Sequence, residues 1–186
     1  MIVRETSIAG CFELIPPAFG DDRGLFVKTF HEGMFREHGL NTDWKEGYYS
    51  VSRQGVLRGL HFQLPPHDHE KLVYLSAGSV LDAVLDLRQG SPSYGGHLLL
   101  ELDAERGNML YLPRGVAHGF YVTSKSATMM YQVSSVYAPQ HDAGILWNSA
   151  GIGWGVDDPR LSPRDAQHPP YPDFATPFAY QPERVQ

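Results

Sequence analysis

Residues 55–73, GVLRGLHFQLPPHDHEKLV, place three histidines, an arginine and a lysine in a segment whose apolar residues otherwise predict a β-strand. Buried strands rarely carry so many ionisable side chains without a purpose. Histidine can act as a base near neutral pH, and its neutral imidazole is a common metal ligand. His61, His67 and His69 could therefore supply a base, hold a metal ion or lie on the surface.

The segment GNMLYLPRGVAHGFYV at residues 107–122 bears on the choice between these roles. Its spacing of glycine, proline and His118 resembles the second signature of the cupin superfamily, which folds as a conical β-barrel. Val122 stands where that signature normally ends in Asn. The resemblance implies a strand and a tight turn that deliver His118 into the mouth of a barrel, whereas the plainer alternative is a turn with an incidental histidine.

A metal-binding cupin has a first signature of His-x-His with a Glu a few residues later. Here His67 and His69 are followed directly by Glu70. Adjacent side chains of a strand point to opposite faces, so His69 and Glu70 could not both face one ion. We therefore expect neither a metal nor another cofactor, and the alternative is a metal-dependent cupin that uses His67, His69 and His118.

A longer resemblance covers about residues 1–170. The segments that carry it are DDRGLF (21–26), GVLRGLHFQLPP (55–66), KLV (71–73), VLDAVLDLRQGSPSYG (80–95), LPRGVAHGF (112–120), YQVSSVYAP (131–139), GILWN (144–148) and LSPRD (161–165). In order and spacing they resemble the dTDP-4-dehydrorhamnose 3,5-epimerase family. The resemblance implies a metal-free isomerase of dTDP-rhamnose and polysaccharide biosynthesis, which epimerises a nucleotide-linked 4-keto-6-deoxyhexose.

Epimerisation beside a ketone needs a base for the α-proton, a stabiliser for the enolate oxygen and an acid on the opposite face. By motif position, the resemblance implies that His61 is the base and that Asp165 is the carboxylate that orients its ring. It implies that Lys71 is the cation beside the keto oxygen, and that Tyr131 is the acid on the far face.

The same resemblance implies further contacts with the substrate. Arg58 matches the clamp on the diphosphate, His118 a residue that lines the site, and Tyr137 a substrate contact. Arg23 and Phe26 lie in a segment that in the family reaches into the neighbouring subunit's pocket. A homodimer is therefore expected to be the functional unit.

Without the resemblance, each catalytic candidate has a plainer explanation. His61 could be a core histidine with satisfied hydrogen bonds, and Lys71 a solvated lysine at a strand end. Tyr131 shares a strand face with two apolar residues and could belong to the core. The sequence Ser-Pro-Arg-Asp that ends at Asp165 is also a good helix start, with Ser162 as the cap.

Three positions depart from the family's pattern. Glu46 and Tyr48 stand where the family usually has Gln and Asn, and Lys28 stands where it usually has Glu. The family positions lie toward the nucleotide end of the pocket, so we expect these three residues to contact the substrate and to alter nucleotide or sugar preference. A milder alternative is that Glu46 and Lys28 pair and preserve thymine recognition.

The elements that would position these side chains are mostly short strands. Apolar runs at 72–76 and 80–87 flank a glycine-containing turn and predict a hairpin. Further strands are predicted at 98–102, 108–112, 119–122 and 127–133, and a helix near 31–39 that ends at Gly39. We expect an all-β, cupin-type jelly roll or conical barrel with a few short helices.

The chain is expected to form one domain over residues 1–186, with an extended C-terminal tail from about residue 169 that lies on the domain or on a partner. Its formal net charge of −6 argues against nucleic-acid binding. No apolar segment suggests a membrane span, and the single cysteine and the lack of a signal peptide favour the cytoplasm.

Four functions remain open from the sequence. The leading one is an epimerase that acts at one or two carbons of the sugar. The others are a ketoisomerase of the same barrel, a metal-dependent cupin and a non-catalytic module that binds a nucleotide sugar. The last of these would need no acid and base, which the candidates His61 and Tyr131 supply.

Overall fold

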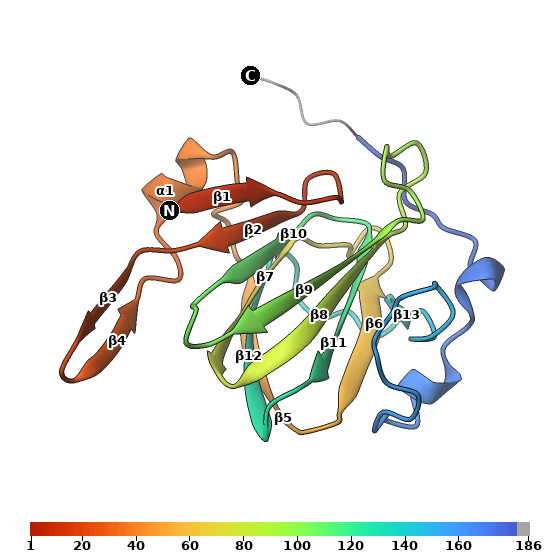
Figure 1. Cartoon of the computed structure of the whole chain (residues 1–186). Helices are drawn as coiled ribbons and strands as arrows, with labels where there is room; N and C mark the ends of the chain where they lie inside the picture. The colour runs from red at the N-terminus through yellow and green to blue at the C-terminus, as the bar shows by residue number, and fades with distance from the viewer. Residues whose placement is uncertain (182–186) are drawn as a thin grey trace.

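The structure is a computed structural model, which describes residues 1–181 (Figure 1). Two antiparallel sheets face each other. The larger has the order β1 (Ile2–Glu5), β2 (Phe12–Ile15), β10 (Met109–Leu112), β7 (Lys71–Ala77), β12 (Ser126–Val133) and β5 (Glu46–Arg53). The smaller has the order β13 (Asp142–Gly144), β6 (Leu57–Gln63), β11 (Val116–Val122), β8 (Ser79–Asp86) and β9 (His97–Asp103). The predicted all-β jelly roll is confirmed.

The remaining elements are short. Helix α1 (Glu32–Glu37) begins after His31, whose ring Nδ1 accepts a hydrogen bond from the Met34 backbone N–H, and the chain turns away at Gly39 with a φ of +69°. The helix predicted near 31–39 is confirmed. Two 3₁₀ turns, η1 (Asp165–Gln167) and η2 (Tyr171–Asp173), follow late in the chain.

The predicted hairpin between residues 72–76 and 80–87 is wrong. Both segments are strands, but β7 pairs with β10 and β12, whereas β8 pairs with β11 and β9. Gly78, at a φ of +80°, turns the chain from one sheet to the other, and a Cβ there would lie 2.6 Å from Ser124 Oγ. A glycine turn between two apolar runs is common to a hairpin and to this corner, so the sequence pattern does not distinguish them.

The five-stranded sheet is covered on both faces, which explains the nearly continuous apolar sequence of β8. Its inner face, with Val84 and Phe120, packs against Val73 and Met129 of the other sheet. Its outer face is covered by the C-terminal segment, which contributes three large buried side chains, Trp147, Trp154 and Phe178. This segment runs beside β6 and β13 in Figure 1.

The C-terminal segment beyond residue 169 lies on its own chain as far as it is described. Phe174 and Phe178 each pack edge-on against Phe62 of β6. Ala179 pairs with Gln89 as a parallel bridge. Residues 182–186 of the predicted tail lie outside the described residues.

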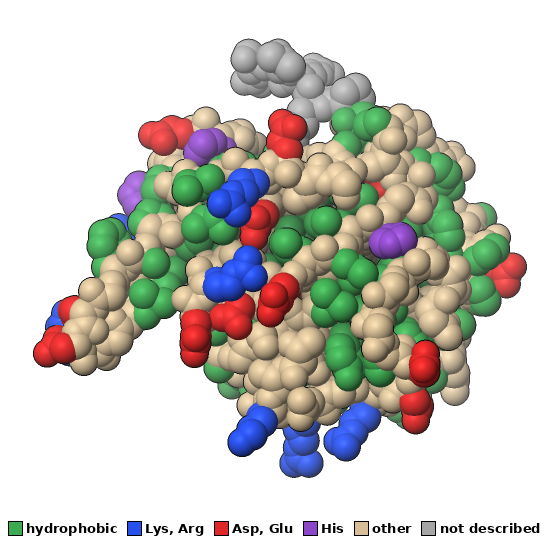
Figure 2. All heavy atoms as spheres, viewed as in Figure 1, with side chains coloured by type: hydrophobic (Ala, Val, Ile, Leu, Met, Phe, Trp, Pro, Cys, Tyr) green, Lys and Arg blue, Asp and Glu red, His purple; other side chains and the backbone are tan. Residues whose placement is uncertain are grey.

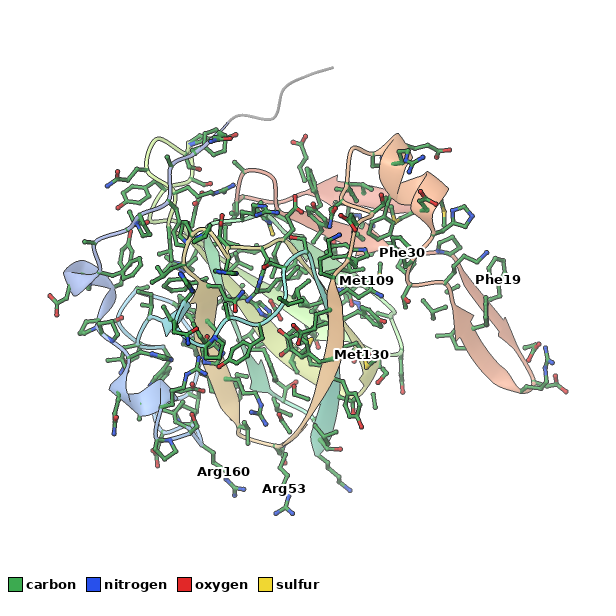
Figure 3. The ribbon with its side chains drawn as sticks, turned by 180° about the vertical axis from the view of Figure 1, so that it is seen from behind. Phe19, Phe30, Arg53, Met109, Met130 and Arg160 are labelled. Atoms are coloured by element: carbon green, nitrogen blue, oxygen red, sulfur yellow. The ribbon has the colours of Figure 1, made fainter. Side chains whose placement is uncertain are left out.

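A hairpin of β3 (Ala18–Asp21) and β4 (Gly24–Val27) stands clear of the two sheets. Figure 2 shows it as an arm with charged side chains at its tip, and Figure 3 shows Phe19 on it, far from the barrel. Phe19 and Phe26 are 61% and 62% exposed although their rings touch. Elsewhere on the face in Figure 2, acidic and basic side chains lie next to one another near the arm, and basic side chains gather at the lower edge.

No helix within residues 1–181 is long and apolar enough to cross a lipid bilayer.

Candidate active site

Two adjoining cavities open between the sheets, with volumes of about 310 and 190 Å³. They share Tyr48, His61 and Lys71 as lining residues. The smaller cavity is lined from both sheets, by Tyr48 and Ser50 of β5, Lys71 of β7, Tyr131 of β12, Arg58 and His61 of β6, and His118, Gly119 and Phe120 of β11. The jelly roll therefore brings together residues that lie as far apart in the sequence as Tyr48 and Tyr131.

His61 is held by Asp165. Nε2 of the His61 ring lies 2.7 Å from Oδ1 of the carboxylate. Burial lowers the pKa of His61 more than the hydrogen bond that its ring donates to Asp165 raises it, so the ring is neutral near pH 7. With Nε2 engaged by the carboxylate, Nδ1 is the ring nitrogen available to accept a proton.

Asp165 begins the turn η1 and also points inward. Its backbone N–H donates to Ser162 Oγ at 3.1 Å, as predicted for a helix start with Ser162 as the cap. Its side chain is only 5% exposed and faces His61. Burial raises the pKa of Asp165, but the nearby His168 ring and the hydrogen bond from His61 outweigh it and hold that pKa well below the usual range. Asp165 is therefore ionised. Its place in a turn capped by Ser162 is compatible with its role as the carboxylate partner of His61.

Lys71 is a buried cation beside the histidine. It is 7% exposed, and its Nζ donates to the His61 carbonyl oxygen at 3.2 Å. Burial lowers its pKa to about 8, although Asp142 and Asp82 act in the opposite direction. Near neutral pH most of the lysine is still protonated, so the cavity contains a positive charge.

Tyr131 lies on the opposite sheet from His61. Burial raises the pKa of Tyr131, so its hydroxyl stays protonated. The Tyr48 ring stacks on it with centroids 4.6 Å apart. We expected Tyr48 to lie toward the nucleotide end of the pocket, and the structure places it directly against the candidate acid.

Arg58 and His118 also line the smaller cavity. The Arg58 Nε donates to Ser52 Oγ at 2.8 Å. His118 is buried and its Nε2 lies 2.9 Å from Asp82 Oδ2. The strands that carry these residues approach closely at Gly59 and Gly119, where a Cβ on Gly119 would lie 2.7 Å from the Arg58 carbonyl oxygen.

The rim of the larger cavity holds a polar cluster. Glu46 Oε2 accepts a hydrogen bond from the Tyr137 backbone N–H at 2.7 Å, and the Tyr137 hydroxyl donates to Asp142 at 3.1 Å. Arg164 pairs with Asp142 at 2.7 Å. Glu46 thus anchors the Tyr137 loop, and within residues 1–181 it does not form the considered ion pair with Lys28.

Three predicted substrate contacts lie outside these cavities. Arg23 and Phe26 lie on the projecting arm, and Lys28 follows it directly. Arg23 binds Asp21 of the same arm, and both side chains are exposed. Within one chain, the structure therefore does not bring these residues to the site.

The considered metal ligands His67, His69 and His118 are not assembled. His67 packs against His141, His118 is engaged by Asp82, and His69 Nδ1 lies 3.1 Å from Gln63 Nε2. Among the described residues, the group with metal-like spacing is His61, Asp165 and His168, whose ligand atoms lie within 4.8 Å of one another. Two imidazoles and a carboxylate suit several divalent metals, but the 2.7 Å contact of His61 with Asp165 is that of a hydrogen bond.

Comparison with known families shows to which family the chain belongs. Residues 5–173 match the sequence model of the dTDP-4-dehydrorhamnose 3,5-epimerase family. The chain belongs to this family. Its membership in the dTDP-4-dehydrorhamnose 3,5-epimerase family puts it among the isomerase-class epimerases.

Individual members of the epimerase family match over nearly the whole chain. The dTDP-4-dehydrorhamnose 3,5-epimerase of Shigella flexneri is 39% identical, over 89% of this chain and 93% of that protein. The Legionella pneumophila dTDP-6-deoxy-D-glucose-3,5-epimerase, solved with dTDP-4-keto-L-rhamnose, is 32% identical with a TM-score of 0.91 over 97% of this chain and 98% of its own. ChmJ, a 3′-monoepimerase of Streptomyces bikiniensis solved with dTDP-quinovose, is 33% identical with a TM-score of 0.83 over 89% and 85%.

Three residues of the candidate site were missed by the sequence analysis. Asp142, Arg164 and His168 come from irregular or very short segments in which hydrophobic periodicity gives no prediction of direction. The one available signal was the position of Arg164 beside Asp165 in LSPRD, a segment already singled out.

Proposed function

We propose that the chain is a metal-independent epimerase of a dTDP-linked 4-keto-6-deoxyhexose, acting at the carbons on either side of the C4 ketone. The observation that carries the proposal is the placement of His61 and Tyr131 on opposite sheets around one cavity. Inversion of a carbon requires removal of a proton from one face of the sugar ring and its return on the other.

His61 is the proposed base. Its neutral ring accepts the α-proton at Nδ1 while the pair of electrons of the broken C–H bond moves toward the ketone oxygen. Asp165 stabilises the imidazolium that forms, because its carboxylate is already ionised and in contact at 2.7 Å.

Lys71 is the proposed stabiliser of the enolate. Its ammonium group lies in a buried position beside His61, where charge–charge attraction is stronger than in water. Tyr131 then donates its phenolic proton to the carbon from the far face. Before the next turnover, solvent returns a proton to the Tyr131 phenolate and takes the proton from the His61 imidazolium.

Arg58 is proposed to clamp the diphosphate, since a guanidinium group matches phosphate oxygens. His118 would line the sugar site and Tyr137 would contact the substrate. The departures at Glu46, Tyr48 and Lys28 lead us to propose that the preferred nucleotide or sugar differs from that of typical relatives. Relatives solved with dTDP-4-keto-L-rhamnose and dTDP-quinovose support a dTDP sugar as the starting point.

We further propose that the chain works as a cytoplasmic homodimer in dTDP-rhamnose and polysaccharide biosynthesis. The projecting arm supports the dimer, because it stands clear of the barrel (Figure 1) and its aromatic side chains Phe19 and Phe26 are exposed. In the dimer, Arg23 and Phe26 would complete the partner's site.

A single-site epimerase is the second candidate. The similarity to the 3′-monoepimerase favours it, and so does the stack of Tyr48 on Tyr131, which restricts where the acid can point. A ketoisomerase would move the carbonyl along the ring and so give a different product.

The test is incubation with dTDP-4-keto-6-deoxyglucose in deuterated water with a chelator present, followed by NMR and mass spectrometry of the sugar. Deuterium at C3 and C5 with inversion is the expected result, and deuterium at one carbon would identify the mono-epimerase. The His61→Asn variant is the control for deuterium exchange that does not depend on the proposed base. A folded wild-type protein that exchanges neither carbon would contradict the proposal.

A further inference from the structure

His168 lies on the far side of Asp165 from His61. Its Nε2 is 3.6 Å from Asp165 Oδ1, the same oxygen that contacts His61. The two imidazole rings meet edge-on, with centroids 5.6 Å apart and an interplanar angle of 74°. The three side chains therefore form a continuous imidazole, carboxylate and imidazole group.

The His168 ring is enclosed and its nitrogen lacks a better partner. Its side chain is 10% exposed, and its Nε2 has no hydrogen-bond partner among residues 1–181. A buried N–H without a partner carries a cost, so a position beside an ionised carboxylate is favourable. A small rotation of either side chain brings the 3.6 Å separation into hydrogen-bond range.

Gly144 makes the space for this ring. It lies opposite His61 in the pairing of β13 with β6, and a Cβ at this position would lie 2.6 Å from Cδ2 of His168. Gly144 is not among the glycines of positive φ, so its backbone conformation does not require glycine. The glycine is needed for the close approach of the histidine.

We infer that His168 is a positioning residue, which shares Oδ1 of Asp165 with His61 and so sets how strongly the carboxylate holds the protonated base. The inference deepens the proposed function and rests on the role of His61 as the base. A carboxylate oxygen that accepts a second hydrogen bond offers less negative charge to the first donor. His168 therefore keeps Asp165 ionised and in place without making His61 too easily protonated.

Loss of the second donor strengthens the attraction between Asp165 and protonated His61, which raises the pKa of His61. The other charged or titratable groups that line the two cavities with His61 are Glu46, Tyr48, Arg58, His69, Lys71, His118, Tyr131, Tyr137, Asp142 and Arg164. None of these groups is changed by a substitution at residue 168.

The first test is an NMR titration of the His61 ring in the full-length protein, compared between the wild type, His168→Phe and His168→Gln. Phenylalanine fills the space of the ring without a donor, whereas the glutamine amide places an N–H near the position of Nε2. We expect His168→Phe to raise the pKa of His61 by about half a unit or more, and His168→Gln to stay near the wild type. His97→Gln, at an exposed position of β9, is the matched control.

The kinetic counterpart is the acid limb of kcat/KM. Because the free enzyme needs neutral His61, the pH midpoint of this limb should rise in His168→Phe by the same amount as the pKa of His61. A rise of half a unit lowers kcat/KM at low pH by about threefold. Affinity for dTDP should not change. A purely structural role would instead lower activity equally at every pH.

Gly144→Ala gives an independent test through the same ring. In the wild type the added methyl displaces His168, so the variant should titrate like His168→Phe. In a His168→Ala background the added methyl has no imidazole ring to contact, so it should have no further effect on the His61 titration.

An unchanged His61 titration in both His168→Phe and Gly144→Ala would overturn the inference. The NMR titration needs no substrate, so it stands apart from the proposed function. A shifted titration in a protein that turns over no nucleotide sugar would refute the proposed function and leave the coupling of His168 to His61 established.

Discussion

The ring of Tyr48 stacks on the ring of Tyr131, with an interplanar angle of 18° and centroids 4.6 Å apart. The two residues are direct partners in the pairing of β5 with β12. Stacking and burial confine the Tyr131 ring and keep its hydroxyl protonated, and burial also raises the pKa of Tyr48 to about 12. Tyr48 therefore positions the proposed acid, at a site where the family usually has a small amide.

Replacement of this stack should separate proton exchange from inversion. In Tyr48→Ala the Tyr131 ring is free to turn, so more enolate is reprotonated from the His61 face or by solvent. We expect deuterium exchange without inversion to rise several-fold relative to inversion, measured by NMR of the sugar in deuterated water, with a loss of about 1 kcal/mol in stability.

Tyr48→Phe is the matched control, because it keeps the stacked ring and removes only the Tyr48 hydroxyl. It should retain the wild-type ratio of exchange to inversion. Equal ratios in Tyr48→Ala and Tyr48→Phe would show that the stack does not position the acid.

Lys71 should set the alkaline limb of the reaction. Its pKa is lowered to about 8, so the ammonium form that stabilises the enolate is lost as the pH rises through about 8. We expect kcat/KM to fall above this pH. In Lys71→Arg the guanidinium remains charged, so the fall near pH 8 should disappear even if the maximum rate is lower.

Lys71→Met should lower kcat/KM by roughly 10²–10³ at every pH, since it removes the cation from the site of the developing oxyanion. The rate profiles of the three proteins are measured between pH 6 and 10 with thermal melts as a check on folding. A fall near pH 8 that persists in Lys71→Arg would assign the limb to another group.

The strands between residues 57 and 133 were largely predictable because apolar runs bounded by glycine and proline mark them directly, whereas β1 to β5 and β13 were not identified from the sequence. The partners of the predicted strands were not predictable. The turn at Gly78 has the sequence of a hairpin but crosses between sheets, because both faces of β8 are buried and its pattern does not identify a neighbour. Short-range patterns carry no information about which sheet a strand joins.

The candidate site, like the fold, could be predicted only in part from the sequence. His61, Lys71 and Tyr131 were identified from motif resemblance, and the fold brings them to one cavity. His168 was missed because its position depends on a chain that returns across β13 and on the missing Cβ of Gly144. Tyr48 was identified as a substrate contact, but resemblance could not show that its ring would lie on Tyr131.

Close approach of β6 and β11 should make Gly119 sensitive to substitution. A Cβ there would lie 2.7 Å from the Arg58 carbonyl oxygen and 3.0 Å from a Leu60 methyl group. Backbone must move to relieve these contacts, and Arg58 and His61 lie on the strand that would move. We expect Gly119→Ala to lower the free energy of unfolding by about 1–3 kcal/mol.

Gly153→Ala is the matched control, since neither glycine has a positive φ and a Cβ on Gly153 meets nothing within 4 Å. It should change the free energy of unfolding in urea by less than about 0.5 kcal/mol. Equal stability of the two alanine variants would mean that the strands separate easily at this point.

The proposed exchange of arms between subunits predicts complementation. An Arg23→Ala/Phe26→Ala double variant would lose the arm's contribution to its partner, and His61→Asn would lose the base in its own chain. Each homodimer should have little activity. The activity of the His61→Asn homodimer should fall by a factor of about 10²–10⁴. In a heterodimer, the site with intact His61 receives the intact arm of the other chain.

Random assortment of equal amounts makes half of the dimers heterodimers, each with one complete site, so about a quarter of wild-type activity should return. The two chains are co-expressed with different tags, and the activity of the mixture is compared with that of the separately expressed variants. If Arg23 and Phe26 instead served their own chain, the site with intact His61 would carry the altered arm and mixing would restore nothing. Recovery of activity therefore requires that the arm act on the site of another subunit, because within residues 1–181 neither Arg23 nor Phe26 lines a cavity that contains His61 of the same chain.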